Sequence, residues 1–140
     1  MRKDEGFLVY LAGPIDAITE GQANGWRRNL SEELLAAGIT CYNPASFTFG
    51  GGSRAARFVL EVNESALEKC DLLVAFIPPD VATVGTVMEL CTAMRKNKPV
   101  LVASPVNFVA LHEVSRVDAL ADVPDWVVAF RDRWARSTLP

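Results

Sequence analysis

The centre of the chain carries the unbroken apolar run DLLVAFI, residues 71–77, which Pro78 and Pro79 bring to an end. The run is short, lacks polar alternation and contains β-branched and aromatic residues, so it predicts a strand buried on both faces. Three shorter runs have the same character: FLVYLA at residues 7–12, ITCY at 39–42 and PVLVA at 99–103. Strands of this kind are typical of parallel sheets covered by helices on each side.

Helical patterns alternate with these strands. Apolar residues between turn signals predict helices over residues 23–37, 54–69 and 86–96. Beyond residue 104 we expect a short helix between residues 108 and 120, a last strand at 126–129 and a polar C-terminal turn or helix. The sequence therefore predicts a single domain, residues 1–140, with a flavodoxin-like, doubly wound α/β fold: about five parallel strands with helices on both faces.

The composition narrows the class of protein. Half of the 140 residues are hydrophobic, and the net charge is only −3, from 14 basic and 17 acidic residues. That balance argues against binding of a polymeric nucleic acid through its phosphates, whereas a free nucleoside or nucleotide needs only a few donors. No run reaches the ~20 apolar residues of a membrane span, and the charged N-terminus does not resemble a signal peptide.

The cysteines and the single histidine bear on compartment and cofactors. Cys41, Cys70 and Cys91 form no CxxC pair, which is typical of reduced thiols in the cytoplasm. His112 is the only histidine, so metal-ligand spacing is missing. The glycines at 50–52 are not followed by the Lys-Ser or Lys-Thr of a triphosphate-binding loop. We therefore expect a cytoplasmic protein without a metal or an organic cofactor.

Two stretches should meet at one edge of the predicted sheet. Ligands of doubly wound sheets bind at the carboxyl ends of the strands, where the winding direction reverses. Residues 13–24 follow the first strand and residues 78–89 follow the central one. Candidate functional residues are therefore sought in these two stretches.

Glu89 admits two interpretations. The sequence Thr86-Val87-Met88-Glu89 has the spacing of a capping box, in which Thr86 caps a helix and Glu89 reaches back to the Thr86 amide. Alternatively, Glu89 lies in the first turn of a helix that begins at the ligand edge, where the helix dipole stabilises a carboxylate suited to attack a sugar carbon. Gly85, just ahead, would let a ligand approach the backbone closely.

Tyr10 stands near the carboxyl end of an otherwise apolar strand, and Gly13 and Pro14 follow it. It is either a core tyrosine whose hydroxyl finds a local partner or a hydroxyl that orients a carboxylate. In the second case Gly13 and Pro14 turn the chain beneath a ligand, and Asp16 could bond a sugar or a base. Trp26 has the spacing of a core residue but could also stack on a base.

Four motifs, in this order, resemble the nucleoside 2-deoxyribosyltransferase superfamily, which also holds related nucleotide N-glycosidases. They are VYLAGP at residues 9–14, Asn43-Pro44, CDLLVA at residues 70–75, and Gly85-x-x-x-Glu89-Leu90. The resemblance runs from Phe7 to Val102. It implies a retaining double displacement in which Glu89 attacks the anomeric carbon and expels the base, and a second base or water then resolves the glycosyl-enzyme. It also implies that Tyr10 orients Glu89.

The resemblance leaves the contact to the leaving base open. The acidic residue that contacts or protonates that base in the superfamily falls on Asn63 or Glu64. Glu64 could act as an acid, since a carboxylic acid with a raised pKa can assist a leaving group. Asn63 could only form a hydrogen bond.

The substrate is open as well. Six residues before the nucleophile, where the transferases carry Asp, this chain has Thr83. Thr83 and Thr86 beside a helix N-terminus would suit a 5′-phosphate, as in the nucleotide-cleaving branch. Asp80 could instead replace the missing Asp after a loop shift. Arg54 and Arg57 are the nearest cationic candidates for a phosphate.

The resemblance therefore implies a nucleoside 2-deoxyribosyltransferase-like enzyme that cleaves and re-forms the N-glycosidic bond of (deoxy)nucleosides. The alternative is a hydrolase that releases the base from a (deoxy)nucleoside 5′-monophosphate. A more distant alternative, favoured if Glu89 is only a cap, is a non-catalytic module that senses a nucleotide. The expected partners are a nucleoside or nucleotide and a free base, and the resemblance implies a homodimer or a higher homo-oligomer.

Overall fold

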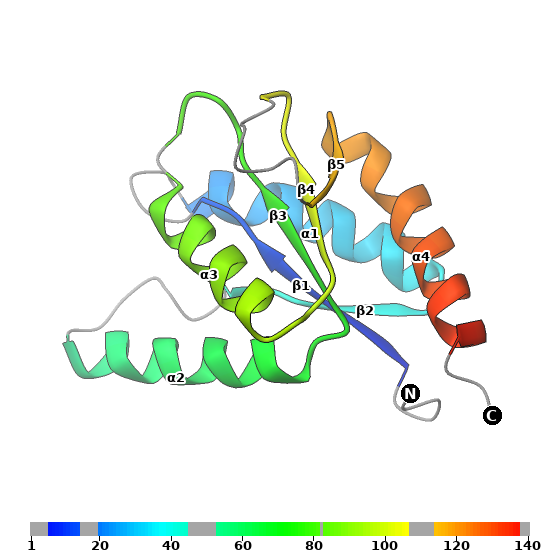
Figure 1. Ribbon diagram of the computed structural model, residues 1–140. Coiled ribbons are helices and arrows are strands. Elements are labelled where there is room, and N and C mark those ends of the chain that lie inside the picture. The colour runs from blue at the N-terminus through cyan, green and yellow to red at the C-terminus, as the bar shows by residue number, and fades with distance from the viewer. Residues whose placement is uncertain (1–5, 15–19, 45–52, 82, 107–113, 138–140) are drawn as a thin grey trace.

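The computed structural model describes residues 6–14, 20–44, 53–81, 83–106 and 114–137, without the side chains of residues 20–21, 53–59 and 136–137. Five strands form one sheet: β1 (Phe7–Ala12), β2 (Ile39–Tyr42), β3 (Leu72–Phe76), β4 (Val100–Ala103) and β5 (Ser115–Val117). The helices are α1 (Glu20–Ala36), α2 (Ser53–Lys69), α3 (Val84–Arg95) and α4 (Val123–Ser137), with a 3₁₀ turn at Leu120–Asp122 (Figure 1).

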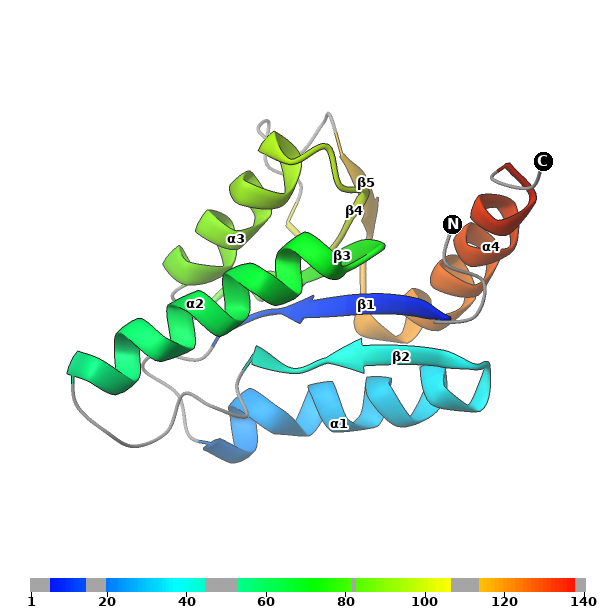
Figure 2. The same ribbon diagram turned by 90° about the horizontal axis from the view of Figure 1, so that it is seen from below.

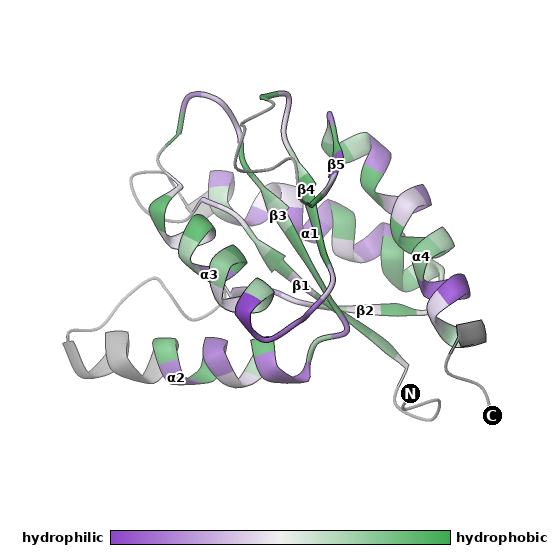
Figure 3. Cartoon of the chain, viewed as in Figure 1, coloured by the Kyte–Doolittle hydropathy of each residue, from purple (hydrophilic) through white to green (hydrophobic). Residues whose placement is uncertain are grey.

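All neighbouring strands pair in parallel, in the order β2-β1-β3-β4-β5. This is the flavodoxin-like order, so the predicted fold class is confirmed. Two helices, α1 and α4, cover one face of the sheet, and α2 and α3 cover the other (Figure 2). Consecutive residues of a strand point to opposite faces, and both faces of the sheet are covered, which is why the central strands β1, β3 and β4 are apolar (Figure 3).

The two faces have separate cores. On the α1 and α4 side, Val9 and Leu11 of β1 are fully buried with side chains of β3 and both helices. On the α2 and α3 side, Tyr10 and Ala12 are fully buried among apolar side chains of α2, β3 and α3. Tyr10 is therefore a core residue of the face that α3 covers, and its hydroxyl lies on the side of the sheet where Glu89 lies.

The prediction for the C-terminal part was wrong. Residues 126–129 belong to α4, and the fifth strand is β5 at Ser115–Val117. Val123 and Val127 are buried at helical spacing, and Trp126 stacks on Phe130 with ring centroids 5.3 Å apart. Four consecutive apolar residues resemble a short buried strand, and the helical period of 3.6 residues becomes visible only over a longer stretch of sequence. The helix expected between residues 108 and 120 falls partly outside the described residues, and its described part contains β5.

Gly13 lies against the ring of Trp26. Trp26 in turn packs against the core on the α1 and α4 side of the sheet, and its ring centroid is 5.1 Å from that of Phe76. A Cβ added at Gly13 would lie 2.4 Å from Trp26 Cζ2. We expect Gly13→Ala to lower the free energy of unfolding by about 1–3 kcal/mol, as overpacking does, measured by urea denaturation. Gly25→Ala is the control, because that helical position is open and alanine should add about 0.5–1 kcal/mol there. Equal stability of Gly13→Ala and the wild type would contradict this packing.

Candidate active site

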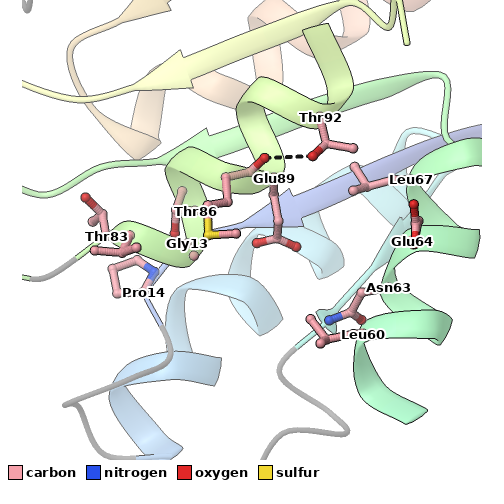
Figure 4. A pocket seen from close by; sticks show the side chains of 13 residues that line it. Gly13, Pro14, Leu60, Asn63, Glu64, Leu67, Thr83, Thr86, Glu89 and Thr92 are labelled. Carbon is pink, nitrogen blue, oxygen red and sulfur yellow. Dashed lines mark hydrogen bonds between the residues drawn. The ribbon is translucent and has the colours of Figure 1, made fainter. Parts of the chain in front are cut away.

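A cavity of about 600 Å³ lies at the carboxyl end of β1, between α2 and the first turns of α3 (Figure 4). Its walls come from the turn after β1, from α2, from the N-cap of α3 and from α3 itself. The lining residues are Gly13, Pro14, Leu60, Asn63, Glu64, Leu67, Thr83, Val84, Gly85, Thr86, Met88, Glu89 and Thr92. The two stretches expected to meet at this edge therefore do so through residues 13–14 and 83–89.

The start of α3 differs from the sequence-based expectation. The helix begins at Val84 with Thr83 as its N-cap, and the Thr83 side chain makes no capping hydrogen bond. Thr86 is thus the third residue of the helix and Glu89 the sixth, so the capping box and the first-turn placement of Glu89 were both wrong. A hydroxyl residue suited to the N-cap occurs three positions earlier than assumed. Glu89 is left free to point into the cavity (Figure 4).

Glu89 accepts a hydrogen bond from the Tyr10 hydroxyl. Burial raises the pKa of Glu89, while the Tyr10 hydrogen bond and the charge of Arg27 lower it in part. Burial also raises the pKa of Tyr10, and the negative charge of Glu89 raises it further. Tyr10 therefore stays a neutral donor, and its expected contact with a carboxylate is present.

The wall formed by α2 contributes Asn63 and Glu64. The oxygen of the Asn63 amide accepts a hydrogen bond of 2.7 Å from the Tyr42 hydroxyl, and the ring of Tyr42 stacks on that of Tyr10 at 5.2 Å. Asn63 is thereby fixed, with its amide nitrogen turned towards the cavity below Glu89 (Figure 4). Glu64 is exposed and lies to the side, near Leu67. The geometry favours Asn63 as the contact to a ligand next to Glu89.

The hydroxyl of Thr86 is an unusual feature of the cavity wall. Thr86 is buried, and its Oγ1 has no hydrogen-bond partner in the part of the chain that the structure describes. Buried hydroxyls are normally paired. The N-terminal end of α3 therefore carries two hydroxyl groups that do not cap the helix: Thr83, whose side chain makes no capping hydrogen bond, and Thr86.

The sequence model of the family described as nucleoside 2-deoxyribosyltransferase-like matches residues 6–107. The chain belongs to this family. The match includes β1, α1, β2, α2, β3, α3 and β4, and therefore every residue that lines the cavity. A comparison with curated protein sequences gives no match.

Several solved structures share the fold of this chain. A 2-deoxyribosyltransferase from Bacillus psychrosaccharolyticus has a TM-score of 0.72 at 20% identity, covering 89% of this chain and 95% of its own. A 2-deoxyribosyltransferase from Leishmania mexicana has a TM-score of 0.60 at 19% identity, covering 81% and 76%. A conserved protein from Enterococcus faecalis V583 has a TM-score of 0.62 at 16% identity, covering 92% and 99%. At such identities the likeness establishes the fold.

Several of the predicted site residues lie away from the cavity or outside the described part. Asp80 is exposed in the turn after β3 and does not line the cavity, so nothing in the geometry supports it as a substitute for a ligand-binding Asp. Asp16 lies outside the described residues. Arg54 and Arg57 belong to α2, but their side chains are not described.

Arg27 was not among the predicted site residues. A charged residue of an amphipathic helix is expected on its polar side, yet Arg27 is fully buried. A signal was present, because Arg27 follows the buried Ala23 by four residues and precedes the buried Leu30 by three. Positions with that spacing share one face of a helix. The apolar lining residues Leu60 and Met88 were also missed.

Among the described residues, no three His, Cys, Asp or Glu side chains are grouped so that they could hold a metal ion. Within the described ranges, no helix combines the length and the apolar character needed to span a bilayer.

Proposed function

We propose that this protein cleaves the N-glycosidic bond of (deoxy)nucleosides and re-forms it with a second base, through a glycosyl ester of Glu89. The observation that carries this proposal is the hydrogen bond from buried Tyr10 to Glu89, a residue that lines the cavity. A carboxylate that is largely withdrawn from water and held by one neutral hydroxyl is suited to covalent catalysis at a sugar carbon. A glutamate that served only as a helix cap would bond to the start of its own helix, whereas Glu89 bonds to Tyr10 of β1.

The steps follow the double displacement of retaining glycosidases. An oxygen of Glu89 bonds to C1′ as the bond from C1′ to the base nitrogen breaks, and the electron pair of that bond stays on the base. The departing base takes up a proton from water, and Asn63 donates a hydrogen bond to it. A second base then attacks C1′ through its nitrogen, expels the Glu89 carboxylate and loses a proton to water.

One feature favours a second candidate, a hydrolase of (deoxy)nucleoside 5′-monophosphates. The hydroxyl of Thr83 makes no bond to the helix that it caps, and Thr86 has an unpaired hydroxyl within the described residues. Hydroxyl groups and backbone N–H groups at a helix N-terminus are suited to a phosphate. In this candidate water replaces the second base and releases the sugar phosphate from Glu89.

A substrate panel separates the candidates. The protein is incubated with deoxynucleosides and their 5′-monophosphates, with and without an added base, and products are separated by liquid chromatography beside Glu89→Ala. A new nucleoside that carries the added base supports transfer. Free base and sugar phosphate from monophosphates alone support the hydrolase. Lack of turnover, or turnover unchanged in Glu89→Ala, would refute Glu89 as nucleophile and favour a nucleotide-sensing module.

The proposed assembly is a homodimer or a higher homo-oligomer acting in the cytoplasm. Leu60, Val84 and Met88 line the cavity, yet their side chains are 69%, 73% and 64% exposed. A second copy would cover this apolar rim and shield the glycosyl ester from water. We expect sedimentation equilibrium to give at least a dimer, and Met88→Glu to weaken it. A monomer at micromolar concentration would contradict this assembly.

A further inference from the structure

Arg27 is a fully buried arginine whose guanidinium group is bonded to the backbone at the end of β1. Its Nε donates to the Leu11 carbonyl at 3.1 Å, and its Nη2 donates to the Gly13 carbonyl at 3.0 Å. Its Nη1 donates to the carbonyls of Pro14, at 3.5 Å, and Ala23. The group thus ties α1 to the turn whose residues Gly13 and Pro14 form one wall of the cavity.

The charge of Arg27 acts on Glu89 without entering the cavity. Arg27 does not line the cavity, and α1 covers the face of the sheet opposite α3 (Figure 2). Its positive charge nevertheless lowers the pKa of Glu89, and the charge of Glu89 in turn raises that of Arg27. Burial outweighs this effect and brings the pKa of Arg27 down to about 10. At neutral pH the guanidinium group is therefore still a cation.

The other groups around Glu89 cannot replace this charge. Tyr10 from β1 and Tyr42 from β2 have raised pKa values and remain neutral hydroxyls. From α2, Asn63 is neutral and Glu64 carries the wrong sign for stabilising a carboxylate. Among the described groups, Arg27 is the one whose positive charge affects Glu89.

A buried cation needs compensation. Moving a charged group out of water is costly unless hydrogen bonds and an opposite charge offset the loss. The carbonyl groups supply the hydrogen bonds to Arg27, and Glu89 supplies negative charge across the end of β1. A lysine at this position would keep the charge but lose the planar fork that joins several carbonyl groups.

We propose that Arg27 is a positioning residue for Glu89: its guanidinium group fixes the turn that walls the cavity, and it places a buried positive charge at the end of β1, the strand whose Tyr10 holds the Glu89 carboxylate. This inference rests on the proposed function, in which Glu89 must be ionised to attack C1′. It assigns Arg27 no contact with the substrate.

The test measures the titration of Glu89 directly and independently of turnover. Glutamate labelled with ¹³C at the carboxyl group reports each side chain by NMR, and the Glu89 signal is the one missing from Glu89→Gln. We expect Arg27→Met to raise the pKa of Glu89 by about one pH unit or more, the effect of removing a nearby opposite charge. The acid limb of the kcat/KM profile should move by the same amount. Arg28→Met, the exposed neighbour on the same helix, should change neither.

Two further variants separate charge from geometry. Arg27→Lys should leave the pKa of Glu89 close to its wild-type value while kcat falls, because the turn is no longer held by the fork. Arg27→Gln keeps hydrogen bonding without charge and should raise the pKa as Arg27→Met does, so the comparison survives if Arg27→Met does not fold. A Glu89 titration that is the same in Arg27→Gln, Arg27→Lys and the wild type would overturn the proposal. Wild-type protein inactive on every nucleoside and nucleotide would refute the proposed function, while the NMR titration would still decide the role of Arg27.

Discussion

Replacing Glu89 with Gln should abolish turnover and leave the fold at least as stable as the wild type at neutral pH. Glutamine has the same shape and can still accept a hydrogen bond from Tyr10, but its amide cannot form the glycosyl ester. We expect kcat to fall by a factor on the order of 10⁴ or more, the scale for loss of a residue essential to covalent catalysis. The proposed intermediate should be absent from intact-protein mass spectra.

The stability part of this prediction follows from the raised pKa of Glu89. Burial makes the folded protein hold the Glu89 proton more tightly than the unfolded chain does. That stabilisation is present at low pH and is lost as the pH rises through the folded-state pKa. At neutral pH the wild type therefore carries a desolvated carboxylate that Glu89→Gln removes.

The measurements are product formation and urea unfolding at neutral pH, with Glu61→Gln as the control. Glu61 is an exposed residue of α2 that does not line the cavity. Activity of the wild type should itself fall as the pH drops through the pKa of Glu89, above the usual range of a glutamate. A Glu89→Gln variant that stays active would refute Glu89 as the nucleophile, and one that is both unstable and inactive would indicate a structural role instead.

The four longer strands of the sheet, β1 to β4, were predictable because each is marked by an apolar run in its own stretch of sequence. Unbroken runs such as residues 71–77 are too short for helices and end at Pro78 or at glycine and asparagine. The edge strand β5 was not predictable in this way. Its three residues, Ser115–Val117, are exposed or half-buried, so no apolar run marks them. The last strand was predicted at residues 126–129 instead, because those residues do form an apolar run.

The site was predictable where function follows from position in the fold. Tyr10 lies near the carboxyl end of β1 and Glu89 follows the central strand, and the parallel sheet brings their side chains together although they are 79 positions apart. The exact start of α3 was not predictable, because Thr83 and Thr86 are equally plausible caps by residue type. Arg27 was missed since a charge is normally assigned to solvent, and only the carbonyl groups at the end of β1 show why it is buried.

Replacing Tyr10 with Phe should slow turnover by about 10- to 100-fold, because hydrogen bonds to charged groups contribute about 1.5–3 kcal/mol. The ring would still fill its fully buried position and stack on Tyr42. The hydroxyl, however, holds the Glu89 carboxylate and lowers its pKa. Its loss should therefore move the acid limb of the pH profile to higher pH as well as lower the rate above that limb.

The effect of Tyr10→Phe on the free energy of unfolding should also depend on whether Glu89 is ionised. Above the pKa of Glu89, Tyr10→Phe leaves a buried carboxylate without its donor, which should cost about 1–3 kcal/mol of unfolding free energy. Below that pKa the protonated carboxyl group needs the hydroxyl less, and the loss should shrink. Tyr42→Phe is the comparison, since it removes the hydrogen bond to Asn63 and should raise KM for the base more than it lowers kcat. If Tyr10→Phe kept the rate and the acid limb of the wild type, Tyr10 would be a core residue whose hydroxyl does not orient Glu89.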